Sequence, residues 1–388
     1  MYVFSHALFL FFALLNIIYL IYILLHLISW IKLPISTISN ASISKTKISV
    51  IIPARNEEAT IGKCIIAIGA QNYPANLLEI IVVDDHSTDK TKEVTEKTLS
   101  EIKISSKIIS NRENVHGKKN AITEAIKNSS GELIVITDAD CKSENKWLST
   151  IETEYKKSGA YMLCGPVEIN SVTSFLGFFQ SLELCGLSLL SGAGINAGAP
   201  LLSNGANMAY TRKIFNDMEG FKGIDANPSG DDILLMFKLH KKYPGKIAFV
   251  KSKDAIVSTS PQLSLKDFIA QRIRWASKGL SSKNTLNSFA SILVFVVNFL
   301  SIIAILLILV HGKVFSLLMV GLAAKITADF LLLLVATHFF GKKKLLLIFP
   351  FAEIFTMLYI AWVGIVANFS SYTWKGREYK TSGIKMLY

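Results

Sequence analysis

Residues 3–31 contain no Lys, Arg, Asp or Glu, and this constrains the fold more than any other feature of the 388-residue chain. About 20 apolar residues in a helix cross the hydrocarbon core of a bilayer, so the segment is long enough to span a membrane. It is longer than the apolar part of a cleavable signal peptide, and no Lys or Arg precedes it. We therefore interpret 1–32 as a retained transmembrane anchor. Lys32, Lys45 and Lys47 then predict that the chain continues in the cytoplasm.

Three more apolar segments occupy the last part of the chain and are predicted to form about three transmembrane helices. The second contains Lys325 and Asp329, which are four residues apart and so on one helical face. The third contains Glu353. Ionisable groups within a membrane suggest a functional site by default, but we favour a buried Lys–Asp pair that only holds helices together. The segments are 287–311, 314–340 and 345–369, within the region 286–370.

The basic tail, 371–388, does not fit a simple count of spans. Four spans that begin with an inward-leading anchor place this tail outside the cell. Yet the tail carries Lys375, Arg377, Lys380 and Lys385, and basic residues favour the cytoplasmic side. Either the charge rule is broken here or one apolar segment is re-entrant or interfacial, and the sequence leaves both alternatives open.

The formal net charge is +12, which first suggests nucleic-acid binding. We expect no nucleic-acid partner, because the sequence has no Arg-rich stripe and because Lys342, Lys343 and Lys344 lie beside an apolar segment. A basic surface also suits an anionic lipid leaflet or a substrate that carries a diphosphate. The four cysteines are not spaced like metal ligands, so we expect reduced, buried thiols.

Residues 45–260 have the composition of a globular domain in which short apolar runs alternate with helical segments. Such alternation predicts an α/β fold with a mostly parallel sheet and right-handed crossovers. In such sheets ligands bind at the carboxyl ends of the strands. The expected strands are 48–53, 79–83, 107–111 and 132–137, and expected helical stretches include 55–70 and 118–128.

Acidic side chains directly follow two of these strands. Asp84 and Asp85 come after the second strand, and Asp138 and Asp140 come after the fourth. Parallel strands place both pairs at one edge of the sheet. Carboxylates in an Asp-x-Asp arrangement suit a hard divalent cation, Mg²⁺ or Mn²⁺, which shares its ligands with substrate phosphates. An Asp-x-Asp alone is weak evidence because aspartates also form turns, but the second pair strengthens the metal interpretation.

Seven short motifs occur along this part of the chain. Together they resemble family 2 glycosyltransferases of the GT-A fold, in the order that this family has, and the resemblance covers about 45–280. It departs from the family at His86, where Gly or another small residue is common, and at Asp231, where Glu is common. The motifs are SVIIPARNEE (49–58), VVDDHSTD (82–89), GKKNAI (117–122), TDADC (137–141), GANMAY (205–210), GDD (230–232) and QRIRW (271–275).

The resemblance implies a nucleotide-sugar site built from the earlier motifs. Asp84 and Asp85 match contacts to the nucleotide base and ribose, and Lys118 matches a position near the donor. Asp138 and Asp140 match the acids that bind the metal and the diphosphate. Considered alone, Lys118 would be interpreted as a solvated surface lysine, but the combined motifs favour a position in the donor-binding site.

The later motifs imply the catalytic groups. Asp232 matches the general base, and Gln271, Arg274 and Trp275 match the Q-x-x-R-W motif, which helps to hold the donor diphosphate and the acceptor. Sugar transfer to a hydroxyl needs a base for the incoming oxygen and charge neutralisation for the leaving diphosphate. Asp232, the metal and Arg274 supply these, and one displacement inverts the anomeric centre. Asp232 also precedes an apolar helical pattern, so it is alternatively a helix-terminal residue.

The acceptor side is indicated more weakly. Asn207 is either a turn residue or an acceptor contact, and Asp231 is a second weak candidate. Residues 175–190 are expected to be too short and too polar to span, and form either a core helix or an interfacial one. The Q-x-x-R-W region, 261–285, is expected at the interface too. This arrangement suits a lipid acceptor, and the tail segment 373–379, TWKGREY, is similar to tails of membrane enzymes that glycosylate lipids or carotenoid acids.

We therefore interpret the chain as an inverting glycosyltransferase that moves a sugar from a nucleotide-sugar, with UDP as the expected nucleotide, to a membrane lipid or lipid-linked acceptor. We expect it in the cytoplasmic membrane of a bacterial cell, with the catalytic domain in the cytoplasm. A processive polysaccharide synthase is the nearest alternative, because Q-x-x-R-W occurs in both classes. An inactive membrane scaffold and a nucleotidyltransferase are more remote, since the acids are intact and the membrane segments argue against the latter.

Overall fold

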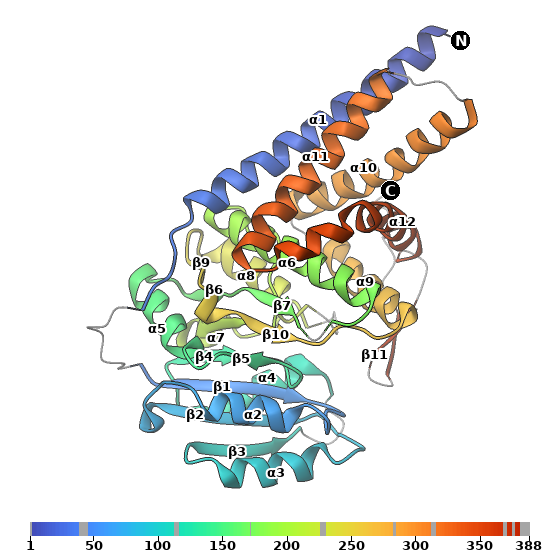
Figure 1. Ribbon diagram of the computed structural model, residues 1–388. Coiled ribbons are helices and arrows are strands. Elements are labelled where there is room, and N and C mark those ends of the chain that lie inside the picture. The colour runs from blue at the N-terminus through green and yellow to red at the C-terminus, as the bar shows by residue number, and fades with distance from the viewer. Residues whose placement is uncertain are drawn as a thin grey trace. The chain divides into compact units, whose positions relative to one another are not determined.

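The computed structural model of the protein divides into two compact units, which we call the sheet unit and the helical unit (Figure 1). The sheet unit comprises 33–172 and 190–261. The helical unit comprises 1–32, 173–189 and 262–388. The residues described are 2–38, 46–111, 116–170, 172–225, 230–281, 285–311, 316–367, 371–374 and 377–380.

The main sheet of the sheet unit has seven strands in the order β3-β2-β1-β4-β8-β6-β9. Its first four strands run parallel to one another, and they match the four strands expected from the sequence to within two residues at each end. β1 and β2 are almost completely buried, as expected for parallel strands covered on both faces. These strands are β1 (Ile48–Ala54), β2 (Leu78–Asp84), β3 (Ser105–Ser110) and β4 (Leu133–Ile136).

The second half of the sheet contains the only antiparallel pairings among the described strands of that sheet. β8 (Met208–Thr211) lies antiparallel between β4 and β6 (Met162–Cys164), and β9 (Ile247–Phe249) runs parallel to β6. The fold is therefore α/β with a mostly parallel sheet, as expected. Because Met208 pairs with Ile136 at the carboxyl end of β4, the loop that leads into β8 arrives at the edge where the acids following β4 begin.

A small three-stranded sheet begins shortly after β4 in the sequence. β5 (Lys142–Ser143) pairs antiparallel with β10 (Val257–Thr259), which pairs parallel with β7 (Val167–Ile169). β5 starts two residues after Asp140. This pairing therefore brings β10 beside the Asp-x-Asp segment.

The helices of the sheet unit flank these strands, and Figure 1 shows α2 and α3 beside β1, β2 and β3. The predicted helix at 118–128 is confirmed, but the helix predicted from Arg55 was wrong in its first part, because α2 begins at Ile61. Asn56 has a left-handed backbone with φ of 51°. The helices are α2 (Ile61–Gly69), α3 (Thr91–Glu101), α4 (Lys118–Lys127), α5 (Trp147–Ser158), α7 (Arg212–Asp217) and α8 (Ile233–Lys242).

The segment before α2 is shaped by side chains of the β2–α3 connection. The backbone N–H groups of Glu57 and Glu58 donate to Thr91 Oγ1 at 2.7 Å and Asp89 Oδ2 at 3.2 Å. Asn56 N likewise donates to Ser87 Oγ. These long-range bonds fix the segment in a non-helical conformation, so tertiary contacts override the local pattern.

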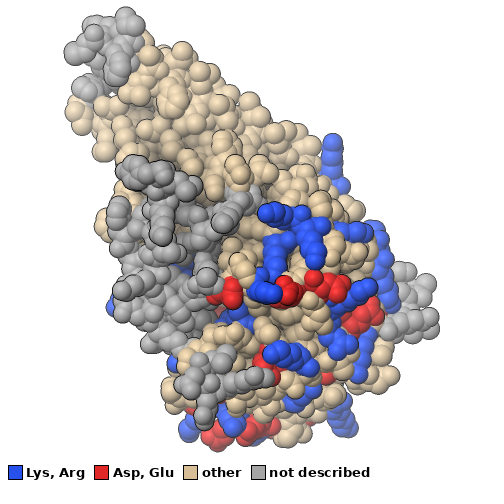
Figure 2. Space-filling model, turned by 180° about the vertical axis from the view of Figure 1, so that it is seen from behind, with Lys and Arg blue, Asp and Glu red and all other residues tan. Residues whose placement is uncertain are grey.

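The helical unit contains most of the long apolar helices. α1 (Tyr2–Lys32) packs along α11 (Ser316–Phe339), and α10 (Thr285–His311) packs against α12 (Phe349–Val366) (Figure 1). A short 3-10 helix, η3 (Lys343–Ile348), precedes α12. In the view of Figure 2 the described surface of these helices shows almost no Lys, Arg, Asp or Glu, and large apolar side chains such as Leu25 and Leu309 are exposed. A surface of this kind suits lipid rather than water.

Among the described residues, five helices are long and apolar enough to cross a membrane: α1, α10, α11, η3 with α12, and α6 (Phe175–Asn196). α6 is longer than the 175–190 segment expected from the sequence. Its neighbours in the chain nevertheless argue against a crossing. β4 precedes α6 and β8 follows it, and the two strands pair in one sheet. A single crossing would put them on opposite sides of the membrane, so α6 is a core or interfacial helix, and two-thirds of its most apolar window is buried.

The ionisable residues of the apolar segments meet in the helical unit. Lys325 is fully buried and contacts both Asp329, at 3.0 Å, and Glu353. Tyr19 of α1 donates to Asp329. The expected Lys–Asp pair is thus part of a larger cluster that joins α1, α11 and α12. The cluster gives the buried charge of Lys325 its partners, without which that charge would be strongly destabilising.

The last described elements are α9 (Leu265–Ser281) and a two-stranded antiparallel ribbon, β11 (Ser371–Trp374) with β12 (Arg377–Lys380). α9 is amphipathic, since Phe268 and Ile273 are buried whereas Lys266 and Asp267 are exposed. Residues 381–388 of the basic tail lie outside the described residues.

Candidate active site

The centre of the candidate site is a lysine between two carboxylates in the sheet unit. Lys118 is the first residue of α4, and its Nζ lies 2.6 Å from Asp138 Oδ1 and 3.2 Å from Asp231 Oδ2. Burial opposes its positive charge, but the carboxylates of Asp138 and Asp231 outweigh that effect and raise the pKa of Lys118 above its ordinary value. Lys118 therefore carries a fixed positive charge at this edge of the sheet.

Asp138 and Asp140 form an acidic pair directly after β4. Burial, followed by the negative charges of Asp138 and Glu57, raises the pKa of Asp140 above its ordinary value. Oxygen atoms of both aspartates lie within 4.8 Å of each other and of Cys141 Sγ. Such a concentration of negative charge fits a divalent cation, and these carboxylates are the residues that would hold one.

One oxygen of Asp140 is oriented by a residue far away in the sequence. Thr259 Oγ1, at the end of β10, donates to Asp140 Oδ2 at 2.9 Å. Cys141 Sγ lies 3.5 Å from the other oxygen. Carboxylates that bind metals are commonly held by such hydrogen bonds. Burial, and then the nearby aspartates, raise the pKa of Cys141 well above its ordinary value. Because the thiolate and not the thiol binds metals, Cys141 is a weaker candidate ligand than the two aspartates.

Asp231 and Asp232 lie at the start of α8. Asp232 caps this helix, because its Oδ1 accepts from Ile233 N at 2.8 Å, and its Oδ2 accepts from Gly205 N at 3.3 Å. The helix-terminal role considered from the sequence is thus present. A Cβ at Gly205 would lie 3.0 Å from Lys118 Nζ and 3.2 Å from Asp231 Oδ2, so the absence of a side chain there leaves the cluster room.

Asp84 is the last residue of β2, which β1 separates from β4, and Asp85 follows it directly. Both are buried. Asp84 accepts from Ser87 N at 3.3 Å, and Asp85 accepts from Asn111 Nδ2 at 2.9 Å and from Gly117 N at 3.1 Å. Gly117 directly precedes Lys118, so the loop before α4 links the two acidic ends of β2 and β4. The structure thus brings six of the expected residues to one sheet edge: Asp84, Asp85, Lys118, Asp138, Asp140 and Asp231, with Asp232 beside them.

Asn207 does not fit the acceptor-side assignment. Its Nδ2 donates to the carbonyl oxygens of Pro166 and Ala255, both at 2.8 Å, and its Oδ1 accepts from Trp147 Nε1 at 3.0 Å. The side chain is buried. Asn207 is therefore a structural residue that fixes the segments around β8, because both ends of its amide are used within the fold.

The Q-x-x-R-W residues belong to the helical unit, whereas the acidic cluster belongs to the sheet unit. All three lie on α9: Gln271, Arg274 and Trp275. Arg272, between them, is buried and stacks on Trp275, with its guanidinium carbon 4.3 Å from the ring centroid. It also donates to Gln271 Oε1. One guanidinium group thus contacts two residues of the Q-x-x-R-W motif.

In each of the two units, some residues that contact the predicted ones were not themselves predicted. Thr259 and Gly205 are ordinary residue types, and nothing in the local pattern connects them to the acids. Arg272 lies inside the QRIRW segment, but only its flanking residues were singled out. Glu183, which pairs with Arg272, was an unremarked charge in an apolar stretch, and an isolated charge of that kind is the one signal that could have indicated it.

A mostly parallel open sheet with acidic pairs after the two strands that flank β1 is the arrangement of the GT-A class. The glycosyl transferase family 2 model matches residues 49–216, and the glycosyl transferase family group 2 model matches residues 133–369. The second match covers more than half of the chain. The chain therefore belongs to the family 2 glycosyltransferases.

Two curated relatives match over shorter stretches. Glycosyltransferase AglE of Haloferax volcanii is 32% identical over 121 residues, which is 31% of this chain and 39% of that protein. A Methanococcus voltae transferase named for dolichyl N-acetyl-alpha-D-glucosaminyl phosphate is 37% identical over 110 residues, 27% of this chain and 33% of that protein. The chain thus spans well under two-thirds of the length of these relatives.

The fold is also found in a solved structure. A mannosyltransferase from Pyrobaculum calidifontis, in complex with GDP-mannose and Mn²⁺, superposes with a TM-score of 0.61. The alignment covers 93% of this chain and 99% of that chain at 17% identity. At this identity the likeness concerns the fold, and it extends over both units of the chain.

Proposed function

We propose that this protein transfers a sugar from a nucleotide-sugar to a lipid or lipid-linked acceptor at a membrane. The observation that carries the proposal is the convergence of Lys118, Asp138, Asp140 and the Asp231–Asp232 pair at one sheet edge. Donor diphosphate, divalent metal and a base for a hydroxyl all need charged groups within this small region. Mg²⁺ or Mn²⁺ is the expected ion, because the ligand set consists of carboxylates.

In the proposed reaction an acceptor hydroxyl attacks the anomeric carbon of the donor sugar. The new carbon–oxygen bond forms as the bond from the sugar to the diphosphate breaks, and the nucleoside diphosphate leaves with the electron pair. Asp232 accepts the hydroxyl proton, and the single displacement inverts the anomeric centre. Lys118 holds Asp138 in place, and a bound divalent ion would supply charge neutralisation at the leaving group.

Within this proposal the residues divide into donor and acceptor groups. Asp84 and Asp85 contact the nucleoside, and Gln271, Arg274 and Trp275 contact the diphosphate and the acceptor. Asp231 contacts Lys118 Nζ at 3.2 Å and helps to hold this cation beside Asp138. The amphipathic helix α9 and the membrane-length helices support a lipid acceptor rather than a soluble one.

A lipid acceptor is further supported by the Methanococcus voltae relative, whose name gives a dolichyl-linked sugar phosphate. We place the protein in the cell membrane with the sheet unit on the cytoplasmic side, because Lys32 and Lys47 flank the end of α1. A processive polysaccharide synthase shares the same donor chemistry, and the product distinguishes the two.

The test is nucleotide release by the full-length protein in detergent with Mg²⁺ or Mn²⁺, a total lipid extract and a panel of UDP- and GDP-sugars. Release that depends on lipid, from one donor, with a single product size supports the proposal. A product that grows in length supports the polymer synthase instead. Asp232→Asn is the control and should abolish release while nucleotide binding persists. Equal turnover in that variant would remove Asp232 as the base.

A further inference from the structure

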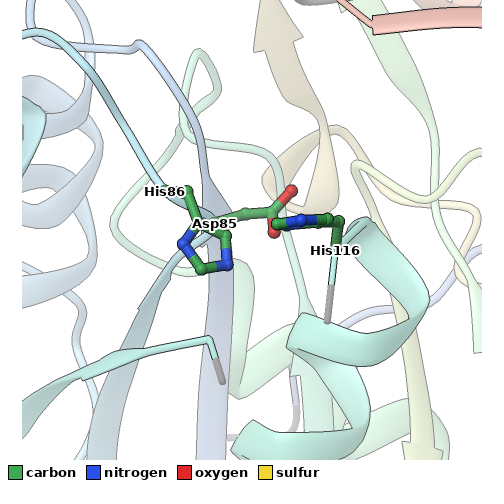
Figure 3. Close-up of side chains that lie close together, drawn as sticks. All are labelled: Asp85, His86 and His116. Atoms are coloured by element: carbon green, nitrogen blue, oxygen red, sulfur yellow. The ribbon is translucent and has the colours of Figure 1, made fainter. Parts of the chain in front are cut away.

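A second group of metal-ligating side chains lies apart from the Asp138–Asp140 pair. Asp85 and His86 come from the end of β2, and His116 comes from the segment that leads into α4; Figure 3 shows the three side chains converging. One potential ligand atom from each lies within 4.8 Å of the other two. The two imidazole rings are arranged edge to face, with centroids 4.6 Å apart.

The carboxylate of this group is already oriented by the fold. Asp85 accepts hydrogen bonds from Asn111 Nδ2 at 2.9 Å and from Gly117 N at 3.1 Å. Arg55 Nη1 donates to the carbonyl oxygens of Asp85 and His86, at 2.6 Å and 3.0 Å. These bonds fix both the side chain and the backbone of the strand end. Metal-binding carboxylates typically have such outer partners.

His86 is held in an unfavourable backbone conformation. Its φ is 59°, in the left-handed region that a glycine would occupy more easily. Backbone strain of this kind is concentrated at functional sites. An imidazole that occurs here despite the strain, beside a second imidazole and an oriented carboxylate, points to a role for the side chain.

We propose that Asp85, His86 and His116 form a binding site for a borderline divalent metal ion, with Zn²⁺ as the first candidate. Two imidazole nitrogens and one carboxylate oxygen are ligands that Zn²⁺ accepts, whereas Mg²⁺ and Mn²⁺ prefer oxygen alone. The two sites therefore differ in ligand chemistry. Ligand atoms around a tetrahedral Zn²⁺ lie about 3.3 Å apart for bonds of about 2.0–2.1 Å. The three ligand atoms lie within 4.8 Å of one another, so metal binding requires a rotation of the exposed His116 side chain toward the other two.

The site has a consequence that rests on the proposed function. Asp85 is expected to contact the nucleoside of the donor. A metal ion bound by the same carboxylate withdraws it from that contact and occupies the space in front of it. Zn²⁺ bound at this site should therefore weaken nucleotide binding.

The first experiment measures metal binding without any donor, so that it does not depend on glycosyl transfer. Tag-free full-length protein in detergent, kept in excess Mg²⁺, is titrated with Zn²⁺ by calorimetry. We expect one tight site, and we expect His86→Gly and His116→Gln each to weaken it at least tenfold, in line with the loss of a direct ligand. Gly suits the φ of residue 86, so that variant should fold. Asp140→Asn is the matched control and should leave Zn²⁺ binding unchanged.

Cobalt absorption identifies the ligands, because Co²⁺ bound to thiolate gives a charge-transfer band that imidazole and carboxylate do not. Loss of Zn²⁺ binding in Asp140→Asn alone, unchanged affinity in both histidine variants, or a thiolate band from Cys141 would each overturn the proposal. A UDP or GDP titration with and without Zn²⁺ then tests the consequence. Competition that disappears in His116→Gln supports it, and nucleotide affinity that is insensitive to Zn²⁺ rejects it.

Discussion

The side chain of Arg272 donates through Nε to the Glu183 carboxylate, at 3.1 Å from Oε2, and pairs with the same group through Nη2. Tyr359 also donates to this carboxylate. The guanidinium lies against Phe268, 4.4 Å from the ring centroid, on one side and Trp275 on the other. A single buried ion pair therefore joins α6, α9 and α12 and holds the side chains of the QRIRW segment.

The first prediction concerns the energy of this pair. Removing one partner leaves an uncompensated buried charge, which typically costs about 3–5 kcal/mol, so Arg272→Gln and Glu183→Gln should each lower the thermal midpoint of the detergent-solubilised protein strongly. A double-mutant cycle measures their coupling. The matched control is Lys222 with Glu219, whose side chains are 70% and 66% exposed, and whose coupling should be much weaker because solvent screens exposed charges. Equal coupling in both pairs would show that the buried pair is not a stabilising contact.

The second prediction concerns Lys118. Lys118→Met leaves the carboxylates of Asp138 and Asp231 facing each other without a cation. We expect kcat/KM for nucleotide release to fall on the order of 10²-fold, the size of effect seen when a single stabilising donor is removed from an active site. Lys127→Met, at the exposed end of the same helix, is the control and should retain activity. Unimpaired release in Lys118→Met would separate this lysine from the donor site.

The third prediction tests the space around Gly205. A Cβ there would meet Lys118 Nζ and Asp231 Oδ2 at 3.0 Å and 3.2 Å, and both side-chain ends must shift by a few tenths of an ångström. Gly205→Ala should therefore reduce turnover several-fold while it changes the thermal midpoint little. A large loss of stability with normal turnover per folded molecule would assign Gly205 to the fold instead.

The fourth prediction concerns acid stability. Glu79 in β2 is buried, and although burial alone opposes its charge, hydrogen bonds from Ser49, Ser130 and Gly131 lower the pKa of its carboxyl below the ordinary value. A depressed folded-state pKa stabilises the fold above the unfolded pKa of about 4.3. That stabilisation is lost as the pH falls through the lower, folded value. Glu79→Gln should be less stable at neutral pH, and the loss of stability on acidification below about pH 4.3 should be smaller than in the wild type.

The fifth prediction concerns α6. If both its ends lie on one side of the membrane, as the pairing of β4 with β8 requires, then Lys103→Cys and Lys213→Cys should be labelled from the same side by an impermeant maleimide. Both positions are exposed, and the four native cysteines are buried, so background labelling should be low. Labelling of the two cysteines from opposite sides, in intact cells and inverted vesicles, would show that α6 crosses the membrane.

The sequence predicted the parallel half of the sheet well, because buried parallel strands are continuous apolar runs and their ends are marked by acids. β1, β2 and β4 are such runs. It did not predict the antiparallel insertion of β8, since a four-residue strand has too short a pattern to show its partner or direction. The helix expected at Arg55 failed for a related reason: distant side chains, not local propensity, decide that segment.

The candidate site was predictable in its acids and not in its supporting residues. Asp84, Asp85, Asp138 and Asp140 follow strands directly, so strand order alone brings them together. Thr259 reaches Asp140 only through the pairing of β5 with β10, which connects residues far apart in the chain. Arg272 and Glu183 meet because two helices pack, and no spacing rule predicts such a contact.

The position of β8 determines when this protein can become a folded enzyme during its synthesis. β8 fills the gap between β4 and β6, and it follows α6 in the chain, so it leaves the ribosome only after α6. Until then β4 and β6 have no neighbour on their facing edges, and unpaired strand edges are prone to aggregation. The apolar helix α6 therefore emerges while the catalytic sheet is still incomplete, and the sheet can close only once this helix is outside the ribosome.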